Sequence, residues 1–277
     1  MEKALRQTLT DMAAGGGRLT VLTGAGISAE SGIPTFRGPE GYWTIGAKEY
    51  QPQEMATFDM FMRKPYEVWK WYLYRMTVCR NADPNPGHFA VTEMEKLFGD
   101  RFTLITQNVD GLHLLAGSSP QRTYQIHGNV FFMRCASECS QQIFPAPENL
   151  PGKDRGDDLT DEEISLLKCP TCGGLARPHV LWFDEAYNEE YFYYMSSLNA
   201  ARETGLLLIV GTAGATNLPS RVAWEVKRQR GIIIDVNIEP NVFSNLALDT
   251  PGGAFLQEPS GKALPKMVDV FREALNG

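Results

Sequence analysis

The segment Val21–Gly38, with the sequence VLTGAGISAESGIPTFRG, constrains the fold of this chain more than any other. A short apolar run leads into Gly24, Gly26 and Ala29, which have the G-x-G-x-x-G/A spacing of strand-to-helix turns that approach a pyrophosphate. A Cβ at either glycine would block both the tight turn and the close approach. The acidic residue that an ordinary dinucleotide fold carries about 20 residues later is replaced by a loop rich in glycine and proline. The segment therefore predicts a nucleotide site, but one of a different construction.

Short apolar, β-branched runs alternate with longer amphipathic segments along most of the chain. The runs predicted as strands are residues 19–23, 102–106, 206–210 and 232–236. The segments predicted as helices are residues 4–12, 88–97, 218–229 and 264–275. This alternation is typical of an α/β fold in which helices cover both faces of a parallel sheet.

Two segments do not follow this alternation, and we expect them to form a smaller lobe. Residues 38–86 are rich in aromatic residues and methionine at helical spacing and predict a helical insert, and residues 131–181 carry four cysteines and predict a ribbon-like, zinc-binding module. The remaining segments, 1–37, 87–130 and 182–277, then form a Rossmann-like domain. Ligands of open α/β sheets bind at the carboxyl edge of the strands, so we expect the active site there, between the lobes.

Composition excludes some classes of function. The chain of 277 residues has 43% hydrophobic residues, which is ordinary for a globular protein. Its formal charge of -7 argues against a nucleic-acid partner, since such proteins usually carry an excess of basic residues. No apolar run approaches the roughly 20 residues of a membrane span, and the N-terminal segment lacks the apolar core of a signal peptide. We expect a cytoplasmic protein with no membrane partner, and the sequence is compatible with a monomer.

Four of the five cysteines form two couples by spacing, Cys135 with Cys139 and Cys169 with Cys172. Such couples can supply four thiolates to a zinc ion, and in a reducing compartment they favour metal binding over disulfides. The couples leave no obvious open coordination position, so we expect one structural zinc ion. The alternative is four thiols without a metal.

Polar residues follow the predicted strands at the ends where a nucleotide would lie. They are Gln107, Asn108 and Asp110 after 102–106, Gly211, Thr212 and Ala213 after 206–210, and Asn237 and Glu239 after 232–236. The amide and carboxylate groups of the first set can bind ribose hydroxyls or a nicotinamide carboxamide, or they form a turn through local hydrogen bonds. His127 directly precedes the cysteine-containing module. Its residue type suits a general base near neutral pH, although a lone histidine is usually structural.

The opening segment resembles the first motif of the sirtuins, the NAD-dependent protein-lysine deacylases. Four later features are similar to the same family in the same order: Thr106–His113 (TQNVDGLH), Ile126–Asn129 (IHGN), the two cysteine couples, and Val236–Glu239 (VNIE). Together they span most of the chain.

This resemblance implies NAD as co-substrate and a structural zinc ion held by the four cysteines. It implies that His127 is the general base, that Asn108 and Asp110 line the pocket into which nicotinamide leaves, that Phe36 shields the reactive sugar carbon and that Arg37 reaches the phosphates. The full set of implied cofactor contacts is Gly24, Ala25, Gly26, Ser28, Phe36, Arg37, Gln107, Asn108, Asp110, Gly211, Thr212, Ala213, Asn237, Glu239 and Ser260. The family usually has serine in place of Ala213 and often glycine in place of Asp184, which puts cofactor affinity and substrate preference in question.

Tyr72 and Arg75 lie three residues apart on a predicted helix and therefore share a face, where a phenol and a guanidinium together suit a carboxylate. The common alternative is a core tyrosine beside an arginine that reaches solvent. The Y-x-x-R spacing, with the small residue Ala56, resembles the sirtuin subgroup that removes succinyl, malonyl or glutaryl groups. The resemblance also implies substrate contacts from His179, Val180 and Phe183.

The resemblance implies a reaction in which the acyl oxygen of an acylated lysine attacks the ribose carbon as nicotinamide leaves. His127 then acts as base on a ribose hydroxyl, and the products are free lysine, nicotinamide and O-acyl-ADP-ribose. Two alternatives remain at this point: mono-ADP-ribosyl transfer or NAD hydrolysis, and a non-catalytic module that senses NAD. The expected partners are proteins or peptides that carry acylated lysine.

Overall fold

A parallel sheet of six strands forms the larger lobe, in the strand order β3-β2-β1-β7-β8-β9. The computed structural model describes residues 2–35 and 52–276. The strands are β1 (Leu19–Thr23), β2 (Phe102–Thr106), β3 (Thr123–Gln125), β7 (Leu206–Val210), β8 (Ile232–Asn237) and β9 (Ala254–Gln257), and every neighbouring pair is parallel. All residues of β1, β2 and β7 are buried, as expected for parallel strands that are covered on both faces.

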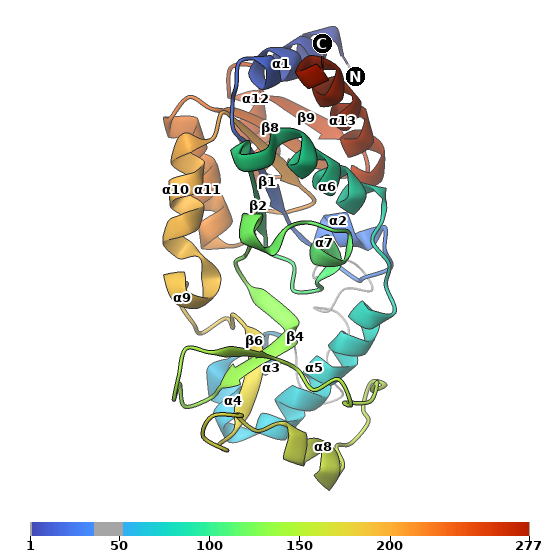
Figure 1. Ribbon diagram of the computed structural model, residues 1–277, viewed down its shortest axis with the longest axis vertical. Helices are drawn as coiled ribbons and strands as arrows, with labels where there is room; N and C mark the ends of the chain where they lie inside the picture. Colours follow the sequence, from blue (N-terminus) through green and yellow to red (C-terminus); the bar gives the residue numbers. More distant parts are fainter. Residues whose placement is uncertain (1, 36–51, 277) are drawn as a thin grey trace.

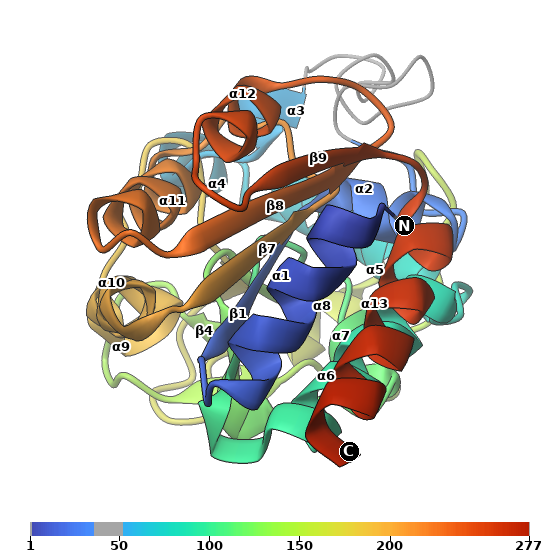
Figure 2. The same ribbon diagram turned by 90° about the horizontal axis from the view of Figure 1, so that it is seen from above.

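Helices pack on both faces of this sheet (Figure 2), which confirms the predicted fold class. The helices on one face are α1 (Lys3–Ala14), α6 (Pro86–Phe98) and α13 (Ser260–Asn276), and those on the other are α10 (Tyr194–Glu203), α11 (Asn217–Arg228) and α12 (Val242–Leu248). The first group encloses one apolar core, in which the rings of Phe98 and Phe271 meet edge to face with centroids 5.0 Å apart. The second encloses a separate core around Val222 and Phe243.

A smaller lobe lies at the end of the molecule away from both termini (Figure 1). Its elements are α3 (Pro52–Met55), α4 (Phe58–Arg63), α5 (Pro65–Arg80), α8 (Asp161–Leu166) and an antiparallel sheet of β5 (Ile143–Pro145), β4 (Gly128–Cys135) and β6 (Ala176–Val180). The helical insert packs directly on this sheet. For example, the indole N–H of Trp69 in α5 donates to the carbonyl oxygen of Ala176 in β6 at 2.9 Å. One apolar cluster joins the insert and the cysteine module into a single lobe.

Several short elements lie between these helices and strands: α2 (Ala25–Ala29), which carries part of the first motif, α7 (Leu112–Leu115), α9 (Glu189–Phe192) and the 3-10 turns Gly99–Arg101 and Pro120–Arg122. At the start of α6, Asn85 accepts a hydrogen bond from the backbone N–H of Gly87, and the His88 side chain bonds back to the N–H of Asn85. This reciprocal cap begins the helix two residues before the predicted position. His88 therefore has a capping role.

Strands β1, β2 and β7 have the predicted bounds, and β8 extends one residue further. The prediction did not include β9, α10 or α12. Strand β4 begins at Gly128 and so crosses the boundary predicted after residue 130, and the division into domains stays a prediction. Among the helices of the described residues, none is both long and apolar enough to cross a membrane.

Candidate functional site

The loops that follow β1, β2, β7 and β8 meet at one edge of the parallel sheet. Parallel neighbours place their carboxyl ends side by side, so residues distant in sequence converge there. The loops contain most of the predicted cofactor contacts: residues 24–28, 107–110, 211–213 and 237–239.

The glycines of the first motif allow two of these loops to touch. A Cβ on Gly26 would lie 2.7 Å from the Cα atom of Gly211, and one on Gly24 would lie 2.6 Å from the Cβ atom of Thr212. Gly211 has a φ of 60°, which favours glycine, and its own Cβ would lie 2.5 Å from the backbone nitrogen of Ile27. In this structure the G-x-G spacing therefore serves contact between the β1 and β7 loops.

Ser28, Asn108 and Asp110 form a buried polar cluster beside these glycines. The Ser28 hydroxyl donates to Asp110 Oδ2 at 2.7 Å, and Asn108 Nδ2 donates to Ser28 Oγ at 3.0 Å and to the Gly24 carbonyl oxygen at 3.1 Å. Burial raises the pKa of the Asp110 carboxyl, while the Leu112 backbone N–H and the Ser28 hydroxyl lower it. The structure thus brings together three residues that the sequence placed at separate motifs.

Gln107 links the cluster to the β7 loop and to His127. Its side-chain nitrogen donates to Thr212 Oγ1 at 2.9 Å, and its side-chain oxygen accepts from Thr216 Oγ1 at 2.9 Å. Its main-chain oxygen lies 3.0 Å from His127 Nδ1. Gln107 therefore uses its side chain to fix the cofactor edge and its backbone to orient the proposed base.

His127 follows β3 and begins the crossing to the small lobe. Its Nδ1 must carry the hydrogen, because the Gln107 carbonyl can only accept, and Nε2 then holds a lone pair 2.7 Å from the Tyr187 hydroxyl. Protein atoms surround most of the partly exposed ring, and this desolvation lowers the pKa of His127 to about 4 against the opposing effect of the Gln107 carbonyl. At neutral pH the imidazole is uncharged, as a general base requires.

The remaining predicted cofactor residues lie around this edge. Asn237 Nδ2 donates to the Thr212 carbonyl oxygen at 3.1 Å, while Ala213 and Glu239 are exposed. The Ser260 hydroxyl and the Gly261 backbone N–H both donate to Glu30 Oε1, at 2.8 and 2.9 Å. Phe36 and Arg37 lie outside the described residues.

Tyr72 and Arg75 occupy the buried face of α5, and both side chains are at most 5% exposed. The Arg75 guanidinium lies 4.8 Å from the ring centroid of Trp71, and its charge lowers the pKa of Asp110. The Tyr72 hydroxyl accepts a hydrogen bond from the indole N–H of Trp182 at 2.8 Å. Burial excludes the alternative in which this arginine reaches solvent.

The segment after β6 is hydrogen-bonded to the helical insert. The Phe183 backbone N–H donates to the Ala56 carbonyl oxygen at 2.9 Å, and the Phe183 side chain is 57% exposed. The Asp184 carboxylate accepts from the backbone N–H groups of Phe58 and Asp59 at 2.7 and 3.1 Å, so it caps α4. Asp184, where the family often has glycine, therefore stabilises the start of a helix in this chain.

Val180 and His179, predicted as substrate contacts, are both buried at the end of β6. The His179 ring stacks on Phe192 with centroids 5.7 Å apart, and burial lowers the pKa of His179 to about 3. This packing against α9 accounts for the ring without a ligand, so its substrate role stays a prediction.

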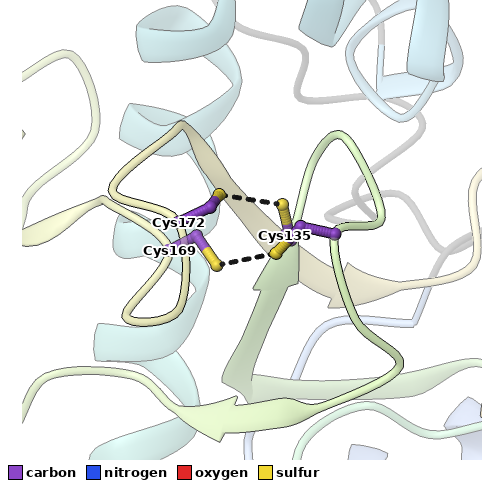
Figure 3. Close-up of side chains that lie close together, drawn as sticks. Cys135, Cys169 and Cys172 are labelled. Atoms are coloured by element: carbon purple, nitrogen blue, oxygen red, sulfur yellow. Dashed lines mark hydrogen bonds between the residues drawn. The ribbon is translucent and has the colours of Figure 1, made fainter.

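The four predicted metal ligands converge in the small lobe, and Figure 3 shows how Cys135 lies opposite Cys169 and Cys172. All four sulfur atoms lie within 4.8 Å of one another, with Cys135 Sγ 3.7 Å from Cys172 Sγ and Cys139 Sγ 3.6 Å from Cys169 Sγ. Four thiolates at the usual Zn–S distance in tetrahedral geometry lie about 3.8 Å apart. Burial opposes ionisation of Cys169, but hydrogen bonds from the backbone N–H groups of Cys172 and Thr171 and from the Cys139 and Cys172 thiols together lower its pKa to about 6. The cluster fits a zinc ion.

Comparison with known proteins agrees with this geometry. Residues 24–217 match the Sir2 family. The chain belongs to the Sir2, or sirtuin, family. An "NAD-dependent protein deacylase" of Pyrococcus furiosus is 41% identical over 250 residues, which cover 90% of this chain and 91% of that protein. A protein of the same name from Leptospira interrogans is 39% identical over 253 residues, covering 91% and 92%.

Solved sirtuin structures share the whole fold. A Sir2 homologue in complex with NAD is 33% identical, with a TM-score of 0.78 over 99% of this chain and 95% of that chain. A Sir2–p53 peptide–NAD+ complex is 25% identical, with a TM-score of 0.72 over 97% and 98%.

Several residues of this sirtuin touch the candidate site without having been predicted. They are Glu30, Thr216, Trp182 and Tyr187. Trp182 directly precedes the predicted Phe183, so its place in the motif was a usable signal. Tyr187 meets His127 across 60 residues of sequence, and no local pattern indicates that contact.

Proposed function

We propose that this chain removes acyl groups from protein lysine side chains with consumption of NAD, and that it accepts acidic acyl groups such as succinyl and malonyl besides acetyl. Relatives named NAD-dependent protein deacylase, and sirtuin structures with NAD and with a peptide, support the general activity. The buried Tyr72–Arg75 pair supports the acidic preference.

NAD, when bound, supplies a sugar carbon from which nicotinamide can leave. The Ser28–Asn108–Asp110 cluster offers hydroxyl, amide and carboxyl groups at fixed positions, so little reorganisation is needed when a ligand replaces their mutual bonds. The uncharged His127 can take a proton from a ribose hydroxyl at Nε2 while Nδ1–H stays on the Gln107 carbonyl. We infer that the products are free lysine, nicotinamide and O-acyl-ADP-ribose.

The acidic preference follows from the chemistry of α5. The indole N–H of Trp182 can only donate, so the Tyr72 oxygen accepts that bond and the phenolic hydrogen remains available for a carboxylate. Arg75 adds a permanent positive charge on the same helix face, and an arginine fork matches a carboxylate in geometry. Ala56, the small residue of this motif, is buried in the same apolar cluster as Tyr72.

Arg75→Met tests this assignment, with acetyl, malonyl, succinyl and glutaryl peptides followed by mass spectrometry. We expect kcat/KM for succinyl-lysine to fall about 10- to 100-fold, since a charged hydrogen bond is worth roughly 1.5–3 kcal/mol, while acetyl-lysine turnover survives. Arg63→Met, which changes an exposed arginine of α4, is the matched control. Equal loss on both peptides contradicts the acidic preference. Gained ADP-ribose mass, or no change with any peptide, contradicts deacylation itself.

A further inference from the structure

In this structure the lone pair on Nε2 of His127, the proposed base, already accepts a hydrogen bond. His127 Nε2 lies 2.7 Å from the Tyr187 hydroxyl, and the tautomer set by the Gln107 carbonyl makes this nitrogen an acceptor. Tyr187 is therefore the donor. An imidazole nitrogen has one lone pair in the ring plane, so it can accept one good hydrogen bond at a time.

We propose that Tyr187 occupies the position of the substrate hydroxyl at His127 in the free protein, and that binding of NAD displaces it. This inference rests on the proposed role of His127 as the base. In the exchange one O–H donor replaces another at Nε2, and Tyr187 keeps its own proton. Tyr187 is thus a positioning residue, which keeps the base in the correct tautomer and orientation until the ribose hydroxyl arrives.

The surroundings of Tyr187 permit this exchange. The residue lies between β6 and α9, in a stretch without regular secondary structure, and it also lines a groove of about 1320 Å³ beside α10 and α11. Tyr187 thus borders open space beside α10 and α11 as well as His127. Burial raises the pKa of Tyr187 to about 12, so the phenol stays protonated and remains a donor.

Hydrogen bonds also connect the base to the loop after β7 in the free protein. The Thr216 hydroxyl donates to Gln107 Oε1 at 2.9 Å, and the Gln107 main-chain oxygen accepts from His127 Nδ1 at 3.0 Å. Because the same glutamine bonds Thr212 in the cofactor loop, ligand binding at that loop and release of Tyr187 act on one connected set of groups. Burial lowers the pKa of His127 and the Gln107 carbonyl opposes this shift, and the titratable group that faces Nε2 is Tyr187.

Tyr187→Phe tests the inference, because it removes the hydroxyl and keeps the ring. Tyr193→Phe is the matched control, since the Tyr193 ring stacks on Tyr124 away from the base. In the NAD-free protein at neutral pH, the 15N resonance of His127 Nε2 should move toward the value of an unbonded nitrogen in Tyr187→Phe and stay in place in the control. An unchanged resonance overturns the inference without any reference to enzymatic activity.

Calorimetry with NAD supplies the second readout. We expect Tyr187→Phe to bind NAD about 2- to 12-fold more tightly, the equivalent of one net hydrogen bond that no longer has to be exchanged. In turnover, kcat/KM for NAD should rise by the same factor with kcat unchanged, and its acid limb should move to higher pH, because the lost bond favoured uncharged His127. A fall in kcat comparable to that of His127→Ala would instead make Tyr187 part of the proton transfer and overturn the displacement. Unchanged affinity for NAD also overturns it.

Discussion

At the carboxyl edge of the parallel sheet, candidate site residues are held by backbone contacts and by hydrogen bonds between polar side chains, whereas in the small lobe they are held by a buried ion pair and aromatic rings. Gly26 and Gly211 bring two loops together so closely that neither position has room for a Cβ. In the small lobe, Arg177 makes a two-pronged ion pair with Glu185 and lies 3.6 Å from the ring centroid of Trp182.

The two arrangements differ in what each can vary. At the sheet edge the strand register fixes the loops, so substitution there disturbs several contacts at once. In the small lobe, Trp182 transmits the position of the Arg177–Glu185 pair to the Tyr72 hydroxyl through a single hydrogen bond. If Tyr72 selects the acyl group as we propose, substrate preference can change through one or two side chains while the sheet edge stays the same.

Loss of the metal should reveal the largest difference between the two lobes. We expect about one zinc ion per chain by elemental analysis, and we expect Cys169→Ser to abolish zinc retention and deacylation, because a structural zinc contributes directly to folding. The larger lobe has its own apolar cores between the parallel sheet and its helices, so the protein should keep much of its helical circular dichroism signal.

Cys79→Ser is the control for this experiment, since Cys79 is a buried thiol of α5 outside the metal cluster. It should keep the zinc ion. A metal-free protein with full activity would show that the cysteine cluster is dispensable, and the contrast between the lobes would lose its strongest support.

The same contrast explains what the sequence could predict. Apolar runs and turn residues were sufficient for β1, β2 and β7, because strands buried on both faces have a simple pattern. Strand β9 was missed because its residues are only partly buried or exposed. Helix α13 begins at Ser260, four residues before the predicted start. Pro265 has no backbone N–H to donate to the Gly261 carbonyl oxygen, but this missing bond lies near the start of the helix, so the helix can begin before the proline.

Site residues were predictable where they follow a strand in a motif, as Gln107, Asn108 and Asp110 do. Their partners were not, because Tyr187 and Thr216 reach the site through tertiary contacts.

Trp182→Phe should give an intermediate effect and sharpen the contrast. It keeps an aromatic ring but removes the N–H that orients Tyr72. We expect KM for a succinyl peptide to rise about 2- to 12-fold, the value of one hydrogen bond, with a smaller change for an acetyl peptide. Phe61→Leu disturbs the same packing without loss of a polar group, since its ring lies 5.2 Å from that of Trp182. If both variants change the ratio of the two KM values equally, packing rather than the hydrogen bond sets the preference.

The smallest effect should come from Asp184, which joins the substrate-side segment to α4. Asp184→Gly removes both acceptors from the first N–H groups of that helix, and loss of such a cap costs about 1 kcal/mol of unfolding free energy. Asp184→Asn keeps one acceptor and should lose about half as much. Urea unfolding measures both, and kcat on an acetyl peptide should hardly change, because the cap lies on the small lobe and leaves the Gln107–His127 contact intact. A large fall in kcat with unchanged stability would instead place this carboxylate among the groups that act on substrate, and the small lobe would then take part in catalysis as well as in selection.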